Sequence, residues 1–331
     1  SSHHSRIQMW GRMAIDSRIK LSNAARSLWG KSDFGMRQAW LPLFVHMIDS
    51  SLVAQRLWDE WLPLSTKRML FRALSGDEQL IRALFVFLGA AHDIGKATPA
   101  FQIQPCSWSM DGDAGSLAWI PEHAGLVFAA GSREKNSPKH ATAGQAILER
   151  LIRSKTGAPV RDVRGIASIV GCHHGKSPSS FDVRSAKEEH PTSMGFDNDT
   201  WQSVQEELFG FCLDLAGIAL EDLGGLARDG VVPQAASVLS GLLIMCDWIA
   251  SNTYAFPLVL LDAYEIESFE GSYSYDGSYE DRALLDSGNE GIPFELVRGR
   301  AQKGWDRVNI LPSWSESLSV VDSCKDLYKS R

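Results

Sequence analysis

The chain has 331 residues, 44% of them hydrophobic and 22% charged, a balance typical of globular proteins. No uninterrupted apolar run reaches the ~18–20 residues of a membrane span, because the richest stretch, residues 238–249, is shorter and contains Asp247. The formal net charge of −7 argues against binding nucleic acid through a broad basic face. With scattered cysteines and no secretory signal, the sequence predicts a cytoplasmic protein without a membrane segment or a disulfide framework.

Apolar residues at helical spacing predict helices at residues 42–61, 78–91, 138–154, 162–175, 200–216 and 233–254. The last of these is the most apolar and is therefore expected to be central. Residues 104–137 and 176–198 are rich in loop-forming and polar residues and predict long irregular connections, and residues 268–291 resemble a linker. No strand alternation is strong enough to predict a sheet. The fold class is therefore predicted to be all-α, a helical bundle with long irregular loops.

Histidines and aspartates flanked by apolar residues lie in or beside several of these helices: His46, His92 with Asp93, His140, His173 with His174, and Asp247. Asp247 has no basic residue in the neighbouring turns, so its buried charge needs a partner, which is a metal ion, a distant arginine or a ring of hydrogen-bond donors. Taken alone, His46 is better explained as a structural histidine. Because such helices pack together, the whole set is expected to converge. Imidazole and carboxylate ligands without thiolate favour iron, manganese, cobalt, nickel or zinc over calcium.

The order of these motifs resembles that of the HD phosphohydrolase superfamily, which is named for the pair seen here as His92-Asp93. The longer sequence motifs around these residues resemble those of the HD nuclease domain of the CRISPR-associated helicase-nuclease of type I systems, over residues 40–256. The matching motifs are Trp40-Leu41-Pro42-Leu43 before His46, Ala91-His92-Asp93-Ile94-Gly95-Lys96-Ala97 with Phe101-Gln102, His173-His174-Gly175-Lys176, and Asp247-Trp248-Ile249-Ala250-Ser251. Leu57-Trp58 and Trp61 are most similar to the type I-E branch.

The resemblance implies an HD-domain bundle and a metal-dependent nuclease that cuts single-stranded DNA by two-metal phosphodiester hydrolysis. The cofactors would be two divalent transition-metal ions, of Fe(II), Mn, Co or Ni, with Zn as a further option. The first ion would be held by His46, His92, Asp93 and Asp247. The second ion would be held by Asp93, His140, His173 and His174. Asp93 would then bridge the two ions.

Three further residues are candidate substrate contacts. Lys96 would act with His92 and Asp93 in catalysis by adding a cation beside the phosphate, or it is a solvated lysine at a helix end. Ser251 would orient Asp247 or contact the nucleotide, or it is a small residue chosen for packing. Lys176 follows the paired histidines and is the third candidate. Other basic residues near these motifs are equally well explained as solvated charges: Arg133, Lys135, Lys139, Arg184 and Lys187.

By the same resemblance, a crRNA-guided surveillance complex (Cascade) would recruit the enzyme to an R-loop, and a helicase would follow the nuclease domain. The sequence contains no GxxxxGK[ST] phosphate loop, so the helicase is expected in cis in a longer chain or in trans. We therefore divide the chain into an N-terminal lead-in at 1–36, with residues 1–4 resembling a tag remnant, an HD nuclease domain at 37–256, and a C-terminal extension or linker towards the helicase at 257–331.

Two other functions stay open at this point. An HD phosphohydrolase acting on a small nucleotide would share the site chemistry but enclose its substrate in a pocket. A catalytically silent recruitment module for the surveillance complex would use only the surface. In the loop at 104–137, Trp108 and Trp119 are expected to stack on bases or to fill the core, and His123 competes with His140 as a ligand. His190 is expected at the surface.

Overall fold

The computed structural model describes residues 18–33, 39–106, 115–260 and 291–308. Its α-helices are α2 (Asn23–Ser27), α3 (Leu43–Arg56), α4 (Leu64–Ala73), α5 (Glu78–Ala91), α6 (Pro99–Gln102), α7 (Trp119–His123), α8 (His140–Thr156), α9 (Val160–Gly171), α10 (Ser180–Glu188), α11 (Pro191–Met194), α12 (Asp199–Ala216), α13 (Leu220–Asp229), α14 (Pro233–Ala250) and α16 (Phe294–Val308). A π-helical turn, η1 (Leu57–Trp61), extends α3, and a 3-10 turn, η2 (Ile94–Lys96), follows α5. Helices dominate, so the predicted all-α class is confirmed.

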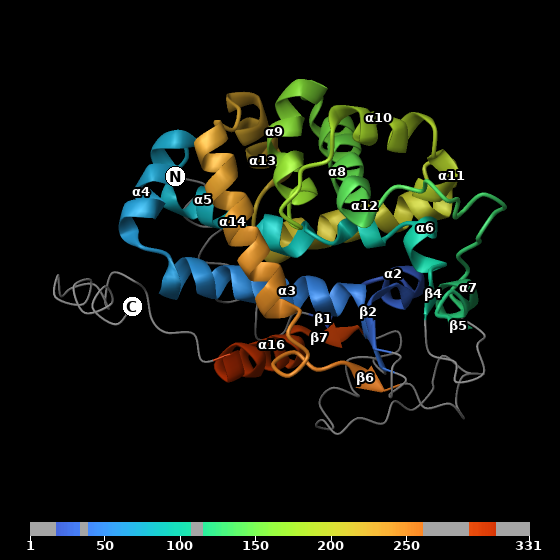
Figure 1. Cartoon of the computed structure of the whole chain (residues 1–331). Helices are drawn as coiled ribbons and strands as arrows, with labels where there is room; N and C mark the ends of the chain where they lie inside the picture. The colour runs from blue at the N-terminus through green and yellow to red at the C-terminus, as the bar shows by residue number, and fades with distance from the viewer. Residues whose placement is uncertain (1–17, 34–38, 107–114, 261–290, 309–331) are drawn as a thin grey trace, which may run out of the picture.

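The strands are short: β1 (Arg18–Ile19), β2 (Trp29–Asp33), β3 (Ala39–Pro42), β4 (Pro105–Cys106), β5 (Gly115–Ser116), β6 (Val259–Leu260) and β7 (Ile292–Pro293). They form three small antiparallel sheets, in the orders β2-β3-β6, β1-β7 and β4-β5. In the first sheet Trp29 pairs with Pro42, and the register shifts between Trp29 and Lys31. The pairs β1-β7 and β3-β6 join segments that are distant in sequence at the edge of the helical bundle (Figure 1).

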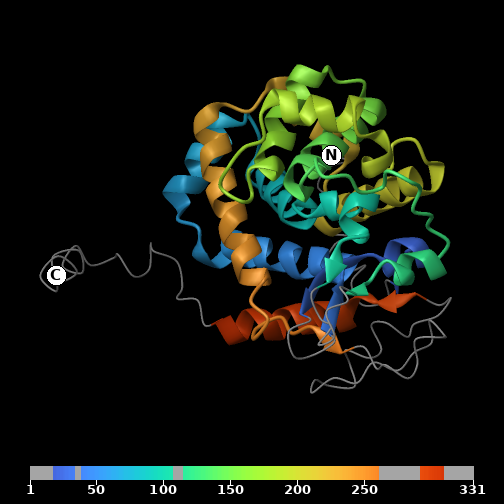
Figure 2. The ribbon, with the colours of Figure 1, turned by 45° about the vertical axis from the view of Figure 1, so that its right-hand side comes forward.

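Helix α3 runs through the middle of the molecule, and most other helices lie on one side of it (Figure 1). It packs against α5 and α14 on that side and against α16 on the other, an arrangement that the turned view also shows (Figure 2). Residues 43–54 of α3 are buried without exception, because both sides of the helix are covered. The histidine on α3 is therefore held inside the protein rather than on its surface.

The segment after residue 256 contributes to this packing. Arg300 of α16 forms a buried ion pair with Asp49 of α3, and it donates a hydrogen bond to the Pro257 carbonyl at 2.6 Å. The division of the chain at residue 256 stays a prediction. The structure adds that α16 is packed on the central helix.

Several local expectations were wrong. The segment at 176–198 contains α10, which begins with a capping box between Ser179 and Asp182, and α11. Only Val183 and Ala186 of α10 are buried, so its periodic signal in the sequence is weak. The region at 104–137 contains the short helix α7. The last predicted helix ends at Ala250, four residues before the expected end.

Helix α14 was expected to be central and is the one helix among the described residues with the length and composition of a membrane span. It packs against α3, α5 and α9, and it carries the buried Asp247. Its buried apolar side chains, among them Leu239 and Leu243, pack within the bundle, but only 33% of the helix is buried and Trp248 is 71% exposed, so α14 is less central than expected.

Candidate metal centre

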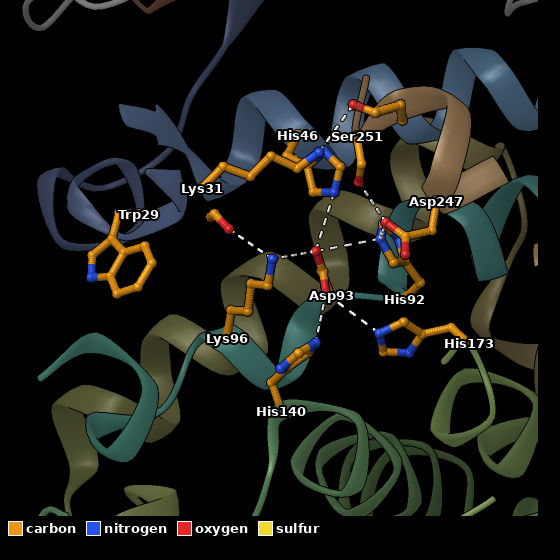
Figure 3. Close-up of polar contacts among 12 residues, drawn as sticks. Trp29, Lys31, His46, His92, Asp93, Lys96, His140, His173, Asp247 and Ser251 are labelled. Carbon is orange, nitrogen blue, oxygen red and sulfur yellow. Dashed lines mark hydrogen bonds and ion pairs between the residues drawn. The ribbon is translucent and has the colours of Figure 1, made fainter. Parts of the chain in front are cut away.

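Asp93 lies at the centre of a cluster of imidazole and lysine side chains (Figure 3). Its Oδ2 atom is 3.1 Å from His46 Nε2, 3.4 Å from His92 Nε2 and 2.7 Å from Lys96 Nζ. Its Oδ1 atom faces the other way, 3.6 Å from His140 Nε2 and 3.7 Å from His173 Nε2. The two oxygens of one carboxylate thus face two different sets of ligands.

Two groups of ligand atoms follow from this arrangement, each with its atoms within 4.8 Å of one another. The first group is His46, His92, Asp93 and Asp247, and the second is His140, His173 and His174. Asp247 Oδ1 is 3.4 Å from His92 Nε2 and accepts a hydrogen bond from Ser251 Oγ at 2.8 Å. His174 Nε2 is 2.8 Å from His140 Nε2. All seven predicted ligands are therefore brought together, and their role in metal binding stays a prediction.

The backbone around Gly95 explains why these segments can meet. Helix α5 ends at Ala91, and Asp93 and the η2 turn then bring the chain against the start of α8. A Cβ atom at Gly95 would lie 1.9 Å from the carbonyl oxygen of His140 and 2.4 Å from the amide nitrogen of Gly144. Only glycine permits this approach. The first residue of α8, His140, consequently reaches the carboxylate of Asp93.

Backbone carbonyl groups orient two of the histidines. His92 Nδ1 is 2.8 Å from the Gly89 carbonyl oxygen, and His173 Nδ1 is 2.6 Å from that of Val170. These contacts place the Nδ1 proton on the carbonyl side and direct each Nε2 atom towards Asp93. Among the described residues, the Nε2 atoms of His46, His92 and His173 are buried and have no hydrogen-bond partner. Buried unsatisfied nitrogens beside a carboxylate fit a divalent transition-metal ion.

The electrostatics of the metal-free cluster differ from one histidine to another. Burial lowers the pKa of His140 to about 3 and that of His173 to about 4, so both imidazoles are neutral at physiological pH. Burial also opposes a charge on His92, but Asp93 and Asp247 outweigh it and raise the pKa of His92 to about 10. Burial opposes the charge on Asp93 as well, yet Lys96 and His92 hold its pKa well below the usual range.

A family model for the HD domain of Cas3 matches residues 29–256. The chain belongs to the Cas3 HD-domain family. The predicted HD-domain bundle is thereby confirmed, whereas the assignment to the type I-E branch stays a prediction.

Curated Cas3 relatives support the same family. The CRISPR-associated nuclease/helicase Cas3 of Streptococcus thermophilus is 35% identical over 253 residues, which cover 72% of this chain and 26% of that protein. The CRISPR-associated endonuclease/helicase Cas3 of Thermus thermophilus is 26% identical over 239 residues, covering 72% of this chain and 23% of that protein. The chain thus spans about a quarter of the length of these relatives.

Solved structures show the same fold. The Thermus thermophilus cas3 HD domain, crystallised in the presence of Ni2+, has a TM-score of 0.51 and 22% identity, with 87% of this chain and 92% of that chain covered. A crystal structure of a CRISPR-associated protein has a TM-score of 0.62 and 23% identity, with 88% of this chain and 28% of that chain covered.

Within this Cas3 HD domain, two lysines occupy positions that the sequence patterns do not describe fully. Lys96 is buried, and its Nζ atom donates to the Gly30 carbonyl at 2.7 Å in addition to its ion pair with Asp93. The alternative of a solvated helix-end lysine is therefore wrong. Lys31 of β2 was missed. Burial and the charge of Lys96 lower the pKa of Lys31 to about 8.

The strand that carries Lys31 is fastened to the Cas3 HD-domain core through Trp29. The Trp29 amide and indole nitrogens donate to the side-chain and backbone carbonyl oxygens of Gln102, both at 3.1 Å. In the sequence, the Gly30-Lys31 pair is too common a pattern to identify a site residue.

Other predicted residues lie away from the cluster. His123 is exposed and its Nδ1 is 2.7 Å from the Trp119 carbonyl oxygen, so in this structure His140 and not His123 joins the ligand group. Trp119 packs against a small apolar cluster rather than standing free, and Trp108 lies outside the described residues. Lys176 is exposed, and among the described residues no hydrogen bond or ion pair joins it to the cluster. His190 is partly buried, with its Nδ1 3.8 Å from Glu134.

Proposed function

We propose that this chain is the nuclease part of a Cas3-type enzyme and hydrolyses phosphodiester bonds in single-stranded DNA with two divalent transition-metal ions. The observation that supports the proposal is the orientation of Asp93, whose two carboxylate oxygens face two separate sets of histidines. A carboxylate can bridge two ions in this way, whereas an imidazole nitrogen binds one.

The residues present fit this cofactor. His46, His92, Asp93 and Asp247 would hold one ion, and Asp93, His140, His173 and His174 would hold the other. When bound, such ions supply Lewis-acid stabilisation of phosphate charge and activation of water. The protein holds the imidazoles in the required tautomer through the carbonyls of Gly89 and Val170, and Ser251 orients the Asp247 carboxylate.

The partners belong to the same proposal. Relatives of about three times this length are named as nuclease/helicases or endonuclease/helicases, which supports a helicase acting in cis or in trans. A structural neighbour with a TM-score of 0.51 is described as a CRISPR RNA-guided surveillance complex, pre-nicking. We therefore propose recruitment of the nuclease by such a complex, as part of antiviral defence in the cytoplasm.

The test is a nuclease assay of the 331-residue chain on single-stranded, double-stranded and mononucleotide substrates with Mn2+, Fe2+ or Ni2+. Asp93→Ala is expected to abolish cleavage of single-stranded DNA while circular dichroism shows an unchanged helical fold, because both ligand groups lose their shared carboxylate. His123→Ala is the matched control and should cleave as the wild type does, because its side chain lies outside the ligand groups. Full cleavage by Asp93→Ala would refute the mechanism.

Anomalous scattering would count the bound ions. A single ion per chain would contradict the two-metal part of the proposal. Hydrolysis restricted to mononucleotides would favour an HD phosphohydrolase of small nucleotides instead.

A further inference from the structure

Lys31 reaches the metal centre from outside the helical bundle. It lies on β2 and is partly exposed, and its Nζ atom donates a hydrogen bond to the Ala250 carbonyl at 3.1 Å (Figure 3). Ala250 is the last residue of α14 and precedes Ser251, which bonds to the ligand Asp247. Lys31 therefore lies at the solvent edge of the ligand cluster.

The positive charge of Lys31 is near the carboxylates of the site but forms no ion pair with them. The ammonium group lies close enough to Asp93, Asp247 and Asp49 for their charges to influence its pKa. No carboxylate oxygen among the described residues lies within the 4.0 Å of an ion pair with Lys31 Nζ. An ammonium group has three N–H donors, and the hydrogen bond to Ala250 uses one of them.

Lys96 provides the contrast. Its Nζ atom is 2.7 Å from Asp93 Oδ2 and donates to the Gly30 carbonyl at 2.7 Å, so two of its three donors are used within the protein. Its side chain is buried, whereas Lys31 is partly exposed. Of the two lysines that flank the carboxylates, Lys31 thus has more donors and more solvent contact left for a ligand.

We propose that Lys31 binds a phosphate oxygen of the single-stranded DNA substrate and so positions the strand at the metal centre. This inference rests on the proposed nuclease function. A phosphodiester fits because it is a singly charged anion with oxygen acceptors on its surface, which matches an ammonium group with unused donors. The competing role is structural, with Lys31 only fastening β2 to the end of α14.

Salt dependence separates the two roles. Binding of single-stranded nucleic acid weakens with log salt by a slope of about 0.7 for each phosphate contact. The assay measures cleavage of a fluorescent oligo-dT at several salt concentrations. We expect Lys31→Gln to lower the slope of log KM against log salt by about 0.7. At low salt its KM should be about tenfold higher than that of the wild type, and its kcat should stay within about twofold. Lys31→Arg keeps the charge and should keep the wild-type slope.

Lys155→Gln is the matched control, because it also removes one positive charge. Lys155 pairs with Glu206 at 2.9 Å near the far end of α8, about 22 Å along the helix axis from His140. For Lys155→Gln, the slope of log KM against log salt should equal that of the wild type. An unchanged slope for Lys31→Gln, with or without a lower melting temperature, would overturn the inference and leave the structural role.

A second measurement needs no variant. Bound oligo-dT should slow acetylation of Lys31 in the wild-type chain by several-fold and leave acetylation of Lys155 unchanged, as read by peptide mass spectrometry. Equal rates with and without DNA would overturn the inference even if Lys31→Gln does not fold. If the wild type neither binds nor cleaves oligo-dT, the proposed function itself fails, which is a different result from a wild type that cleaves but shows no role for Lys31.

Discussion

Replacing Gly95 by alanine should pull the two ligand groups apart. The new Cβ atom would lie 1.9 Å from the His140 carbonyl oxygen and 2.4 Å from the Gly144 amide nitrogen. Since real contacts of a Cβ atom are essentially never below 3.0 Å, the start of α8 has to move away by about 1.1 Å. Both neighbours are backbone atoms, so no side-chain rotation can relieve the overlap. The φ angle of Gly95 is not positive, so its backbone conformation is open to alanine and the effect is steric alone.

The cost follows from the size of this shift. Overpacking of a well-packed site costs about 1–3 kcal/mol, and each kcal/mol lowers the melting temperature of a domain of this size by about 2–4 °C. A displacement of about 1 Å at a reacting centre lowers the rate by about 100-fold. We therefore expect Gly95→Ala to melt several degrees lower, to lose the ion that we propose His140, His173 and His174 hold, and to cleave about 100-fold more slowly.

Differential scanning calorimetry, metal content per chain and the nuclease assay would measure these effects. Gly210→Ala on α12 is the matched control, because a Cβ atom there meets nothing within 4 Å. It should keep its metal and activity and gain up to about 1 kcal/mol from helix propensity. A Gly95→Ala variant with wild-type melting temperature and metal content would refute the reasoning.

Two further predictions concern charge. In the metal-free protein the pKa of His92 is raised to about 10, so the ring is protonated at pH 7.5. Because a metal ligand must be neutral, metal binding should release about one proton. The metal affinity should therefore rise about tenfold per pH unit up to pH 10. Calorimetric titrations in buffers of different ionisation enthalpy would detect the proton, and an absence of release would contradict the pKa. Arg300→Met should destabilise the protein by about 3–5 kcal/mol, because it removes the guanidinium that faces the buried Asp49. Arg298→Met, which removes an exposed pair, should cost less than about 1 kcal/mol by urea denaturation, and equal costs for the two variants would show that the buried pair has no special weight.

The helical class and the approximate positions of the main helices could be predicted from the sequence, because long apolar runs at helical spacing are local signals. Helix α5 was predicted with the bounds that the structure has, since Asp77 caps its start and its side chains are almost all apolar. Helix α10 was missed because only two of its side chains are buried. Short or weakly amphipathic helices depend on packing that residue spacing does not report.

The donor set of the site was also accessible from the sequence. Histidines and aspartates within apolar helices cannot be buried alone at low cost, so their convergence was expected before any coordinates. Their order also led to the family, which the comparison over residues 29–256 confirmed. For Asp247 alone, however, a metal ion, an arginine and hydrogen-bond donors were all still possible.

Only the tertiary structure decided how these groups meet. The partners that it places beside Asp247 are His92 and Ser251, and it divides the two oxygens of Asp93 between two sets of histidines. It also brings Lys31 to the end of α14 across 219 positions of the chain. Residue type and local periodicity determine which groups are available and which faces of the helices are buried. The direction of a carboxylate and the arrival of a distant strand depend on contacts between remote segments, and these are set by the packing of the whole bundle.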